Sequence, residues 1–314
     1  METITINLDQ NIEALIEKFC QDCKLRGMTK ASITRYKSTL LMFANHFNNA
    51  DLITLNKEML KEFLRYLKFE REVKHKTIEN NFSALSSFYD YLVFHEITDR
   101  NLVLHFRKRY LKMYKNNDNN SRRKIITVKE MSQLVNSILD PRDKAISLVL
   151  AKTGVRRGEL LKIDVQDINW NNYSILLQPV PKRSNRVVYF DDECAIVLRR
   201  WLNVRTKLNP TTKALFVSYQ TLNRLSRNAA YQAVVKYAQR LGFHNPKTPR
   251  LEDHFGPHCF RHWFTTYLLR NEMSREYVKE LRGDRRKEAI DIYDHIDPED
   301  LRRKYLACIP QLGI

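Results

Sequence analysis

A short polar segment in the middle of the chain sets the strongest limit on how it can fold. Residues 116–121, NNDNNS, contain no apolar side chain, and basic residues crowd both sides of them within the stretch 105–124. Such a segment cannot contribute to a hydrophobic core and is typical of a flexible linker. We therefore expect two domains, residues 1–112 and 126–314, joined by a basic flexible linker at 113–125. A linker of this charge suits a protein that closes around a duplex, and a merely solvated hinge is the alternative.

The first domain is predicted to be a small bundle of four helices. Apolar residues recur with the 3.6-residue period of an amphipathic helix in four successive segments. Thr29 is placed to cap the second helix, and the fourth starts near Thr77. Cys20 and Cys23 form a CxxC pair, but no second pair follows, so we assign both to the core. The apolar positions are Ile12, Leu15, Ile16, Phe19, Cys20 and Cys23; Ile33, Tyr36, Leu40, Phe43 and Phe47; Met59, Leu60, Phe63, Leu64 and Leu67; and Ile78, Phe82, Leu85, Phe88, Tyr89 and Leu92.

The second domain is predicted to mix helices with a small sheet. It opens with Thr127 and Glu130 at the spacing of a capping box, and Pro141 suits the first turn of the next helix. Two strands are expected within residues 173–190, around the polar turn PKRSN. The other expected elements are helices at 191–208, 221–241, 257–271 and 274–282 and a short strand at 215–218. The predicted fold class is therefore mainly α with a small β-sheet, an N-terminal helical bundle followed by a mixed α/β domain.

The charge of the chain points to a polyanion as its partner. The formal net charge is +18 over 314 residues. Residues 1–125 carry 22 Lys and Arg against 15 Asp and Glu, and the rest of the chain is also basic. A ligand that touches both domains fits this distribution. Nucleic acid is the leading candidate, and a generally solvated basic surface is the alternative.

Composition also indicates a cytoplasmic protein without a membrane span. No run of about 18 apolar residues occurs. The start, METITINLDQ, is acidic and lacks the apolar segment of a secretory signal. The five cysteines are odd in number and widely scattered, which favours a reducing compartment over a disulfide framework.

Two arginine-containing stretches are suited to binding a phosphate. In TGVRRGEL, Gly154 ends one helix and Arg156 begins the next, where Glu159 would orient its guanidinium group. In PHCFRHWF, His258 and Arg261 are spaced to share one helix face, while His262 is assigned to packing or to the surface. An imidazole that handles a proton and a guanidinium that binds two oxygens would together suit a phosphodiester. Each stretch alone is equally compatible with ordinary surface residues.

A lysine and a tyrosine complete the set of candidate residues. Lys182 lies in the turn PKRSNR, and Tyr293 lies in EAIDIYDHID near the end of the chain. A tyrosine hydroxyl, with an ordinary pKa of about 10, is a poor nucleophile unless cations stabilise the phenolate or a base removes the proton. The arginines, the lysine and the histidine would supply both, so the sequence predicts phosphoryl transfer without a metal. The sequence contains no P-loop, HExxH motif, zinc spacing or carboxylate cluster. Tyr305 is the second candidate nucleophile.

In order and spacing, these motifs resemble the tyrosine recombinases, or phage-type integrases, and in particular the branch of Xer recombinases and archaeal integrases. The resemblance covers nearly the whole chain, and the first domain is similar to the family's SAM-like core-binding domain. It implies that Arg156 and Arg261 clamp the scissile phosphate. It further implies that His258 accepts a proton or hydrogen-bonds the phosphate, that Lys182 protonates the leaving 5′ oxygen, and that Tyr293 is the nucleophile.

Two positions depart from the family pattern. The turn around Lys182 is one residue shorter than the common form, which leaves Arg183 as a rival. Nine residues before Tyr293, where the family usually has histidine or tryptophan, this chain reads LRGD and has Asp284. An ionised carboxylate would oppose a phosphate, so we expect Asp284 to accept a hydrogen bond from Tyr293 or to orient an arginine. His295 would partly compensate.

The resemblance implies a site-specific DNA recombinase or integrase that acts through a 3′-phosphotyrosyl intermediate, with no metal or nucleotide cofactor. Its partners would be double-stranded DNA with specific recombination sites and further copies of the chain. The expected assembly is a homotetramer on DNA and a monomer or dimer when free, at the nucleoid of a prokaryotic cytoplasm. A type IB-like topoisomerase, a catalytically weakened DNA-binding regulator and, last, a metal nuclease are the alternatives. The tail 301–314 either docks on a neighbouring protomer or packs on its own domain.

Overall fold

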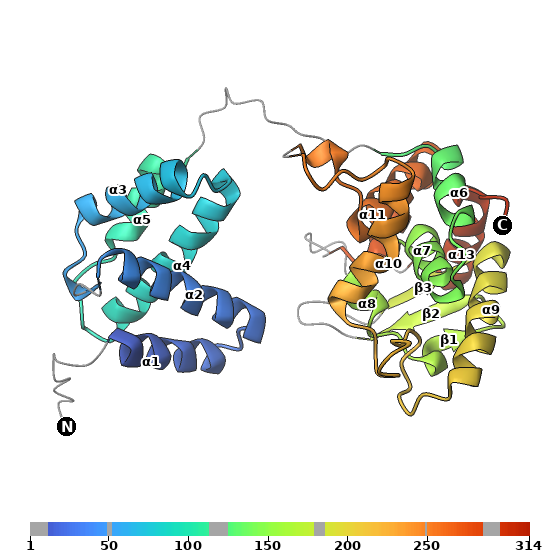
Figure 1. Cartoon of the computed structure of the whole chain (residues 1–314), viewed down its shortest axis with the longest axis horizontal. Helices are drawn as coiled ribbons and strands as arrows, with labels where there is room; N and C mark the ends of the chain where they lie inside the picture. The colour runs from blue at the N-terminus through green and yellow to red at the C-terminus, as the bar shows by residue number, and fades with distance from the viewer. Residues whose placement is uncertain (1–11, 49–51, 113–124, 179–185, 249, 285–295) are drawn as a thin grey trace. The chain divides into compact units, whose positions relative to one another are not determined.

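The chain forms two compact units, residues 1–119 and 120–314 (Figure 1). The computed structural model describes residues 12–48, 52–112, 125–178, 186–248, 250–284 and 296–314. Nearly all of the predicted linker therefore lies outside the described residues. Within the parts that the structure describes, no helix is long and apolar enough to cross a bilayer.

The described part of the N-terminal unit is a bundle of five α-helices. These are α1 (Ile12–Leu25), α2 (Lys30–His46), α3 (Lys57–Arg65), α4 (His75–Phe94) and α5 (Leu102–Tyr110), with a π-helical turn (Tyr66–Glu70) after α3 and a 3₁₀ turn (Leu52–Thr54) before it. The predicted apolar stripes face inward, and Cys20 and Cys23 are buried among them, as expected of core residues. Thr29 caps α2 by accepting a hydrogen bond from the N–H of Ser32 at 3.3 Å. Five phenylalanines of this core are completely buried: Phe19, Phe43, Phe63, Phe82 and Phe88.

The helix α5 corrects the prediction of four helices. Asn101 caps it by accepting a hydrogen bond from the N–H of Val103 at 2.9 Å, and Phe106 stacks on Phe82 with a centroid distance of 5.3 Å. The helix has only nine residues, and its last turn carries Arg107, Lys108 and Arg109. A short, basic segment next to a polar one has the sequence pattern of a linker, and only the packing of its few apolar side chains makes it part of the bundle.

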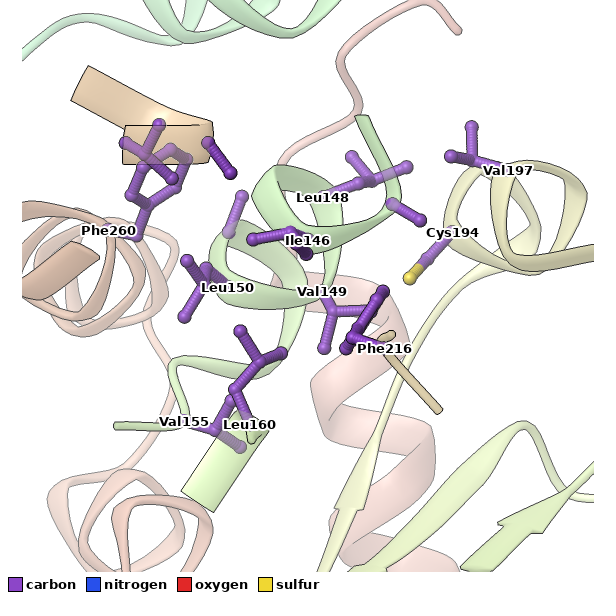
Figure 2. Close-up of a cluster of buried hydrophobic side chains, with 14 of the residues drawn as sticks. Ile146, Leu148, Val149, Leu150, Val155, Leu160, Cys194, Val197, Phe216 and Phe260 are labelled. Atoms are coloured by element: carbon purple, nitrogen blue, oxygen red, sulfur yellow. The ribbon is translucent and has the colours of Figure 1, made fainter. Parts of the chain in front are cut away.

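The C-terminal unit is built around the buried helix α7 (Pro141–Thr153). Helices α6 (Val128–Asn136), α9 (Asp192–Leu208), α10 (Arg227–Arg240) and α11 (Pro257–Arg270) pack against it. In Figure 2, Leu150 of α7 lies toward Phe260 of α11. Leu148 and Val149 lie on the other side of α7, toward Cys194 and Val197 of α9. Because α7 is enclosed, its C-terminal end is held firmly where the candidate site begins.

A small antiparallel sheet lies beside these helices, with the strand order β1–β2–β3. The strands are β1 (Ile168–Asn169), β2 (Ser174–Leu177) and β3 (Arg186–Tyr189). Ser174 pairs with Tyr189 and Leu177 with Arg186, which confirms the predicted antiparallel pair. The remaining elements are α8 (Arg157–Leu160), α12 (Arg275–Arg282), α13 (Pro298–Cys308) and 3₁₀ turns at Val165–Asp167 and Leu251–Asp253.

Local signals in the second unit are partly confirmed. Thr127 and Glu130 form the predicted capping box, and Pro141 is the first residue of α7. The helix expected at 221–241 begins only at Arg227, because Ser226 caps it. Residues 215–218 are not a strand, because the backbone turns back over 218–223 and leaves only an isolated bridge between Val217 and Arg224.

The C-terminal tail packs on its own unit around a buried lysine. The Nζ of Lys152, on α7, lies 2.5 Å from Asp191 Oδ2 and 2.6 Å from Glu193 Oε2 and donates to the carbonyl of Pro310 at 2.7 Å. The carboxylate of Glu193 in turn accepts the backbone N–H groups of residues 312–314. Of the two alternatives for the tail, this structure has the second, packing on its own domain. Replacing one charged residue of such a cluster by a neutral one would leave a buried charge uncompensated.

Candidate active site

Arg156 is positioned by a glycine turn at the end of α7. Gly154 has a left-handed φ of +60°, and a β-carbon added to it would lie 2.3 Å from a ring carbon of Phe264. Only glycine satisfies both conditions, since other residues are strained at positive φ and would collide with α11. Arg156 follows as the N-cap of α8, and its N–H donates to Glu159 Oε2 at 2.8 Å. The turn thus fixes the backbone from which the arginine extends.

Arg261 reaches the same place from α11. The residue is only 3% exposed, and its Nη1 donates to the carbonyl of Gly154 at 2.8 Å. Its Nη2 donates to the carbonyl of Arg282 at 2.8 Å, and Arg156 Nη1 donates to that same oxygen at 3.2 Å. Burial, together with the positive charges of Arg156 and Arg282, lowers the pKa of Arg261 to about 10. Two guanidinium groups from distant segments therefore converge at the C-terminal end of α12.

Asp284 lies within this group of arginines. Its Oδ1 is 3.3 Å from Arg261 Nη2 and 3.6 Å from Arg156 Nη2, and its Oδ2 is 3.1 Å from Arg282 Nε. One carboxylate thus faces three guanidinium groups, which leaves an excess of positive charge. Of the two expectations for Asp284, the contacts correspond to orienting arginines. The other, a hydrogen bond from Tyr293, involves a residue outside the described ranges.

Arg186 and Glu159 form a buried pair that was not predicted from the sequence. Arg186 Nη1 and Nη2 donate to the two oxygens of Glu159 at 3.1 and 2.9 Å, and its Nε donates to the carbonyl of Leu281 at 3.1 Å. Glu159 was expected to orient Arg156, but that contact is longer, at 3.4 Å. Burial raises the pKa of Glu159, yet the hydrogen bonds from Arg186 and from the backbone of Arg156 outweigh it, so the pKa is lowered overall.

The burial of Arg186 could have been predicted from its place in the strand. Side chains alternate between the two faces of a strand, so Arg186 lies on the same face of β3 as the buried Val188, while Val187 between them is 40% exposed. A β-carbon at Gly283, with φ +59°, would lie 2.6 Å from Arg186 Nη1, so the glycine makes room for the arginine. Arg186 therefore joins the hairpin to α8 and to the end of α12, which carries the carbonyl shared by the two site arginines.

His258, which is exposed, is the second residue of α11 and lies one turn before Arg261. Its ring contacts that of His262 nearly perpendicularly, with a centroid distance of 4.7 Å, and His262 is exposed. His258 and Arg156 both line one cavity of about 430 Å³. The structure therefore brings together four of the six predicted residues: Arg156, His258, Arg261 and Asp284.

The other two predicted residues, Lys182 and Tyr293, lie outside the described residues, as do Arg183 and His295. Tyr305, the second candidate nucleophile, is fully buried, and its hydroxyl donates to the carbonyl of Lys152 at 2.8 Å. Burial raises its pKa well above the ordinary value. A hydroxyl that is enclosed and held protonated in this way is not placed to attack a substrate.

Two family models match the chain. The model of the phage integrase family matches residues 124–300, and that of the phage integrase N-terminal SAM-like domain matches residues 15–99. Tyrosine recombinase XerC of Psychromonas ingrahamii is 26% identical over 89% of this chain and 90% of its own length. XerC of Histophilus somni is 30% identical, but the match spans only about half of either chain, 53% of each.

Solved structures of recombinases share the fold. XerH bound to a palindromic difH substrate in a post-cleavage complex has a TM-score of 0.67 and 21% identity, covering 93% of this chain and 83% of that one. A lambda integrase tetramer bound to a Holliday junction has a TM-score of 0.69 and 15% identity, covering 94% and 82%. At these identities the likeness concerns the fold alone.

Proposed function

The chain belongs to the phage integrase family, that of the tyrosine recombinases, and we propose that it is an Xer-like site-specific recombinase that cuts and rejoins double-stranded DNA. The observation that carries the proposal is the convergence of Arg156 and Arg261 on one carbonyl, beside a cavity that His258 also lines. Two guanidinium groups held side by side suit the non-bridging oxygens of a phosphodiester.

Tyr293 is the proposed nucleophile. Its hydroxyl oxygen attacks the phosphorus while its proton passes to His258, and the bond from phosphorus to the 5′ oxygen breaks. Lys182 gives a proton to that leaving oxygen, and a 3′-phosphotyrosyl bond remains. Arg156 and Arg261 stabilise the negative charge that develops on the phosphoryl oxygens. The 5′-hydroxyl of a partner strand reverses the step. The number of phosphodiester bonds is unchanged, so the reaction needs no nucleotide and, with cations already in place, no metal.

Asp284 takes the place of the usual histidine or tryptophan, and we assign it to positioning Arg156 and Arg261. It contacts both arginines as well as Arg282, so it fixes their side chains relative to one another. Its negative charge also weakens the attraction of the site for a phosphate. We therefore expect this enzyme to react more slowly than relatives that have a neutral hydrogen-bond donor at this position.

We further propose that the active assembly is a tetramer on two duplexes and that the helical bundle also binds DNA. The lambda integrase tetramer on a Holliday junction, which shares this fold, supports the first point. The net positive charge of residues 1–125 supports the second. The same proposal places the protein in the prokaryotic cytoplasm, where chromosomal DNA is the substrate.

A suicide DNA substrate tests the proposed function. Duplexes that the protein selects from a random pool supply the binding site, and a nick near the crossover lets a short fragment escape and traps the covalent intermediate. The protein is incubated with this DNA in EDTA and run on a denaturing gel beside Tyr293→Phe. Tyr219→Phe, an exposed tyrosine of the same unit, is the matched control.

We expect a slowly migrating adduct that survives EDTA, is retained by the control and is lost in Tyr293→Phe. An adduct that persists in Tyr293→Phe would assign the nucleophile elsewhere. Cleavage that EDTA abolishes would favour a metal nuclease. Tight DNA binding without any adduct would favour the weakened regulator, with Asp284 as its cause. Relaxation of supercoiled DNA by a monomer, without strand exchange, would favour a topoisomerase.

A further inference from the structure

The cavity beside the candidate active site extends beyond the residues that the proposed chemistry uses. Its volume of about 430 Å³ is lined by the start of α8, by the first turns of α10, and by Leu251 and residues 254–258, which lead into α11. Arg156 and His258 are part of this lining, so the cavity is continuous with the candidate site. Ligand sites typically measure ~300–1,000 Å³, so there is room for a sugar–phosphate unit.

The electrostatics of the cavity favour an anion. The described residues that line it include Arg157 and Arg227 in addition to Arg156, and no aspartate or glutamate. Within the described parts of the chain, no carboxylate forms an ion pair with Arg157 or Arg227. Burial lowers the pKa of Arg157, and the positive charge of Arg227 lowers it further. Among the described residues, these two cations lie close together without an acidic partner, and a bound anion would relieve their repulsion.

The side chains around the cavity are held in place by local structure. Arg157 is the first residue of α8 and Arg227 the first residue of α10. Tyr231 follows Arg227 by one helical turn, so both lie on the same face of α10. The ring centroid of Tyr231 lies 5.8 Å from Arg157 Cζ. A β-carbon at Gly256 would lie 3.2 Å from Tyr231 Cε2, so this glycine lets the ring lie close to the backbone before α11.

We propose that Arg157 and Arg227 bind a second backbone phosphate of the DNA, next to the scissile one, with Tyr231 packed against the sugar. This inference rests on the proposed function and adds a subsite to it. A phosphate fixed at Arg157 would hold the strand in register, because Arg156, the neighbouring residue, binds the reacting phosphate. Such a contact positions the strand without reading its sequence.

The salt dependence of DNA binding tests the subsite. Binding to short duplexes of unrelated sequence is measured over a series of KCl concentrations with the full chain. Each phosphate contact contributes about 0.9 to the slope of log Kd against log salt concentration. We expect Arg157→Gln and Arg227→Gln to lower the slope, together by about 0.9 because they share one phosphate, and to weaken binding equally on all sequences. Arg240→Gln, at the far end of α10, removes the same charge and should leave the slope unchanged.

Gly158 offers a second test that does not remove an arginine. It lines the cavity, and a β-carbon added to it would meet no atom within 4 Å. Gly158→Glu and Gly158→Gln introduce side chains of nearly equal size that differ in charge. We expect the glutamate to weaken DNA binding at least tenfold relative to the glutamine, because its carboxylate would enter the cavity. Equal thermal melting of the two variants checks that both are folded.

The possible outcomes separate the subsite from the proposed function. Unchanged slopes in both arginine variants, with the Tyr293-dependent adduct still formed, would overturn the subsite and leave the function standing. A loss of affinity that depends on base sequence would also overturn it, because it would indicate contacts to bases. A wild-type protein that binds no DNA would remove the proposed function and the subsite together.

Discussion

Arg156 and Arg261 donate hydrogen bonds to one acceptor, the carbonyl oxygen of Arg282, at 3.2 and 2.8 Å. This carbonyl belongs to the last residue of α12, where the helix dipole favours cations. The two guanidinium groups are therefore held together before a ligand arrives. A phosphate bound between them would need little rearrangement of the protein, which is the condition for strong electrostatic stabilisation.

Arg261→Lys is expected to slow formation of the covalent adduct by about 10²–10³-fold, the usual loss when a positioned donor to a developing oxyanion is removed. Lysine keeps the charge but cannot reach the carbonyls of Gly154 and Arg282 and a phosphate at the same time. Single-turnover adduct formation at saturating protein measures the rate. Arg240→Lys, an exposed arginine of the same unit, is the control, and an equal loss in both variants would contradict the role of Arg261.

Asp284→Asn is expected to bind DNA more tightly, by roughly tenfold at low salt, because it removes a negative charge that faces three guanidinium groups. The gain should shrink as the salt concentration rises. Fluorescence anisotropy with a labelled duplex measures it, and Asp192→Asn, an exposed carboxylate at the start of α9, is the matched control. Weaker binding by Asp284→Asn would mean that Asp284 supports the arginines more than it competes with the phosphate.

Gly154→Ala is expected to destabilise the C-terminal unit by clearly more than Gly242→Ala. Both glycines have positive φ, +60° and +74°, so both substitutions carry the strain of about 1–2 kcal/mol for a left-handed residue. Only at Gly154 does the added β-carbon collide, with Phe264 at 2.3 Å, whereas at Gly242 no atom lies within 4 Å. Urea unfolding of the two variants provides the comparison. Equal free energies of unfolding would show that the contact with Phe264 relaxes freely.

The C-terminal unit is expected to lose stability in acid below about pH 4.5. Burial raises the pKa of Glu159 and of Glu193, but hydrogen bonds from Arg186 and Lys152 respectively outweigh it, so both lie below the ordinary value of 4.5. A carboxylate whose pKa is lowered by folding contributes its full stabilisation when the pH is above its pKa in the unfolded state. This stabilisation is lost as the pH falls through its pKa in the folded state. Urea midpoints measured stepwise with decreasing pH test this.

The variant Glu193→Gln provides the check on that prediction. It should unfold at lower urea concentration than the wild type at neutral pH and depend less on pH in the acid range, since one of the titrating groups is gone. A pH dependence identical to that of the wild type would mean that Glu193 does not contribute to it.

The sequence was sufficient to predict features that depend on neighbouring residues. The apolar period placed α1 to α4 of the bundle, and Thr29 and Thr127 marked helix starts that the structure confirms. The helix end at Gly154 and the helix start at Arg156 could be predicted for the same reason, since the two residues are close together in the chain. The assignments of Lys182 and Tyr293 stay predictions.

Features that depend on distant partners could not be predicted in this way. Nothing near Arg186 in the chain indicates that it pairs with Glu159, because the contact forms only when the hairpin packs on α8. The position of Asp284 among three arginines likewise requires α8, α11 and α12 together. The start of α10 was predicted six residues too early. Ser226 caps the helix, and the backbone before it turns back over residues 218–223 instead of continuing as a helix.

The attachment of the tail to Lys152 and Glu193 has a consequence for the order of events during synthesis. Residues 310–314 leave the ribosome after the rest of the unit, yet they supply the carbonyl that Lys152 donates to and three N–H groups that Glu193 accepts. A nascent chain that has emerged only to Ile309 thus has an incomplete ion cluster at the last turn of α7, shortly before Arg156. Full rigidity of the site is therefore reached late, when nearly the whole unit is free of the ribosome.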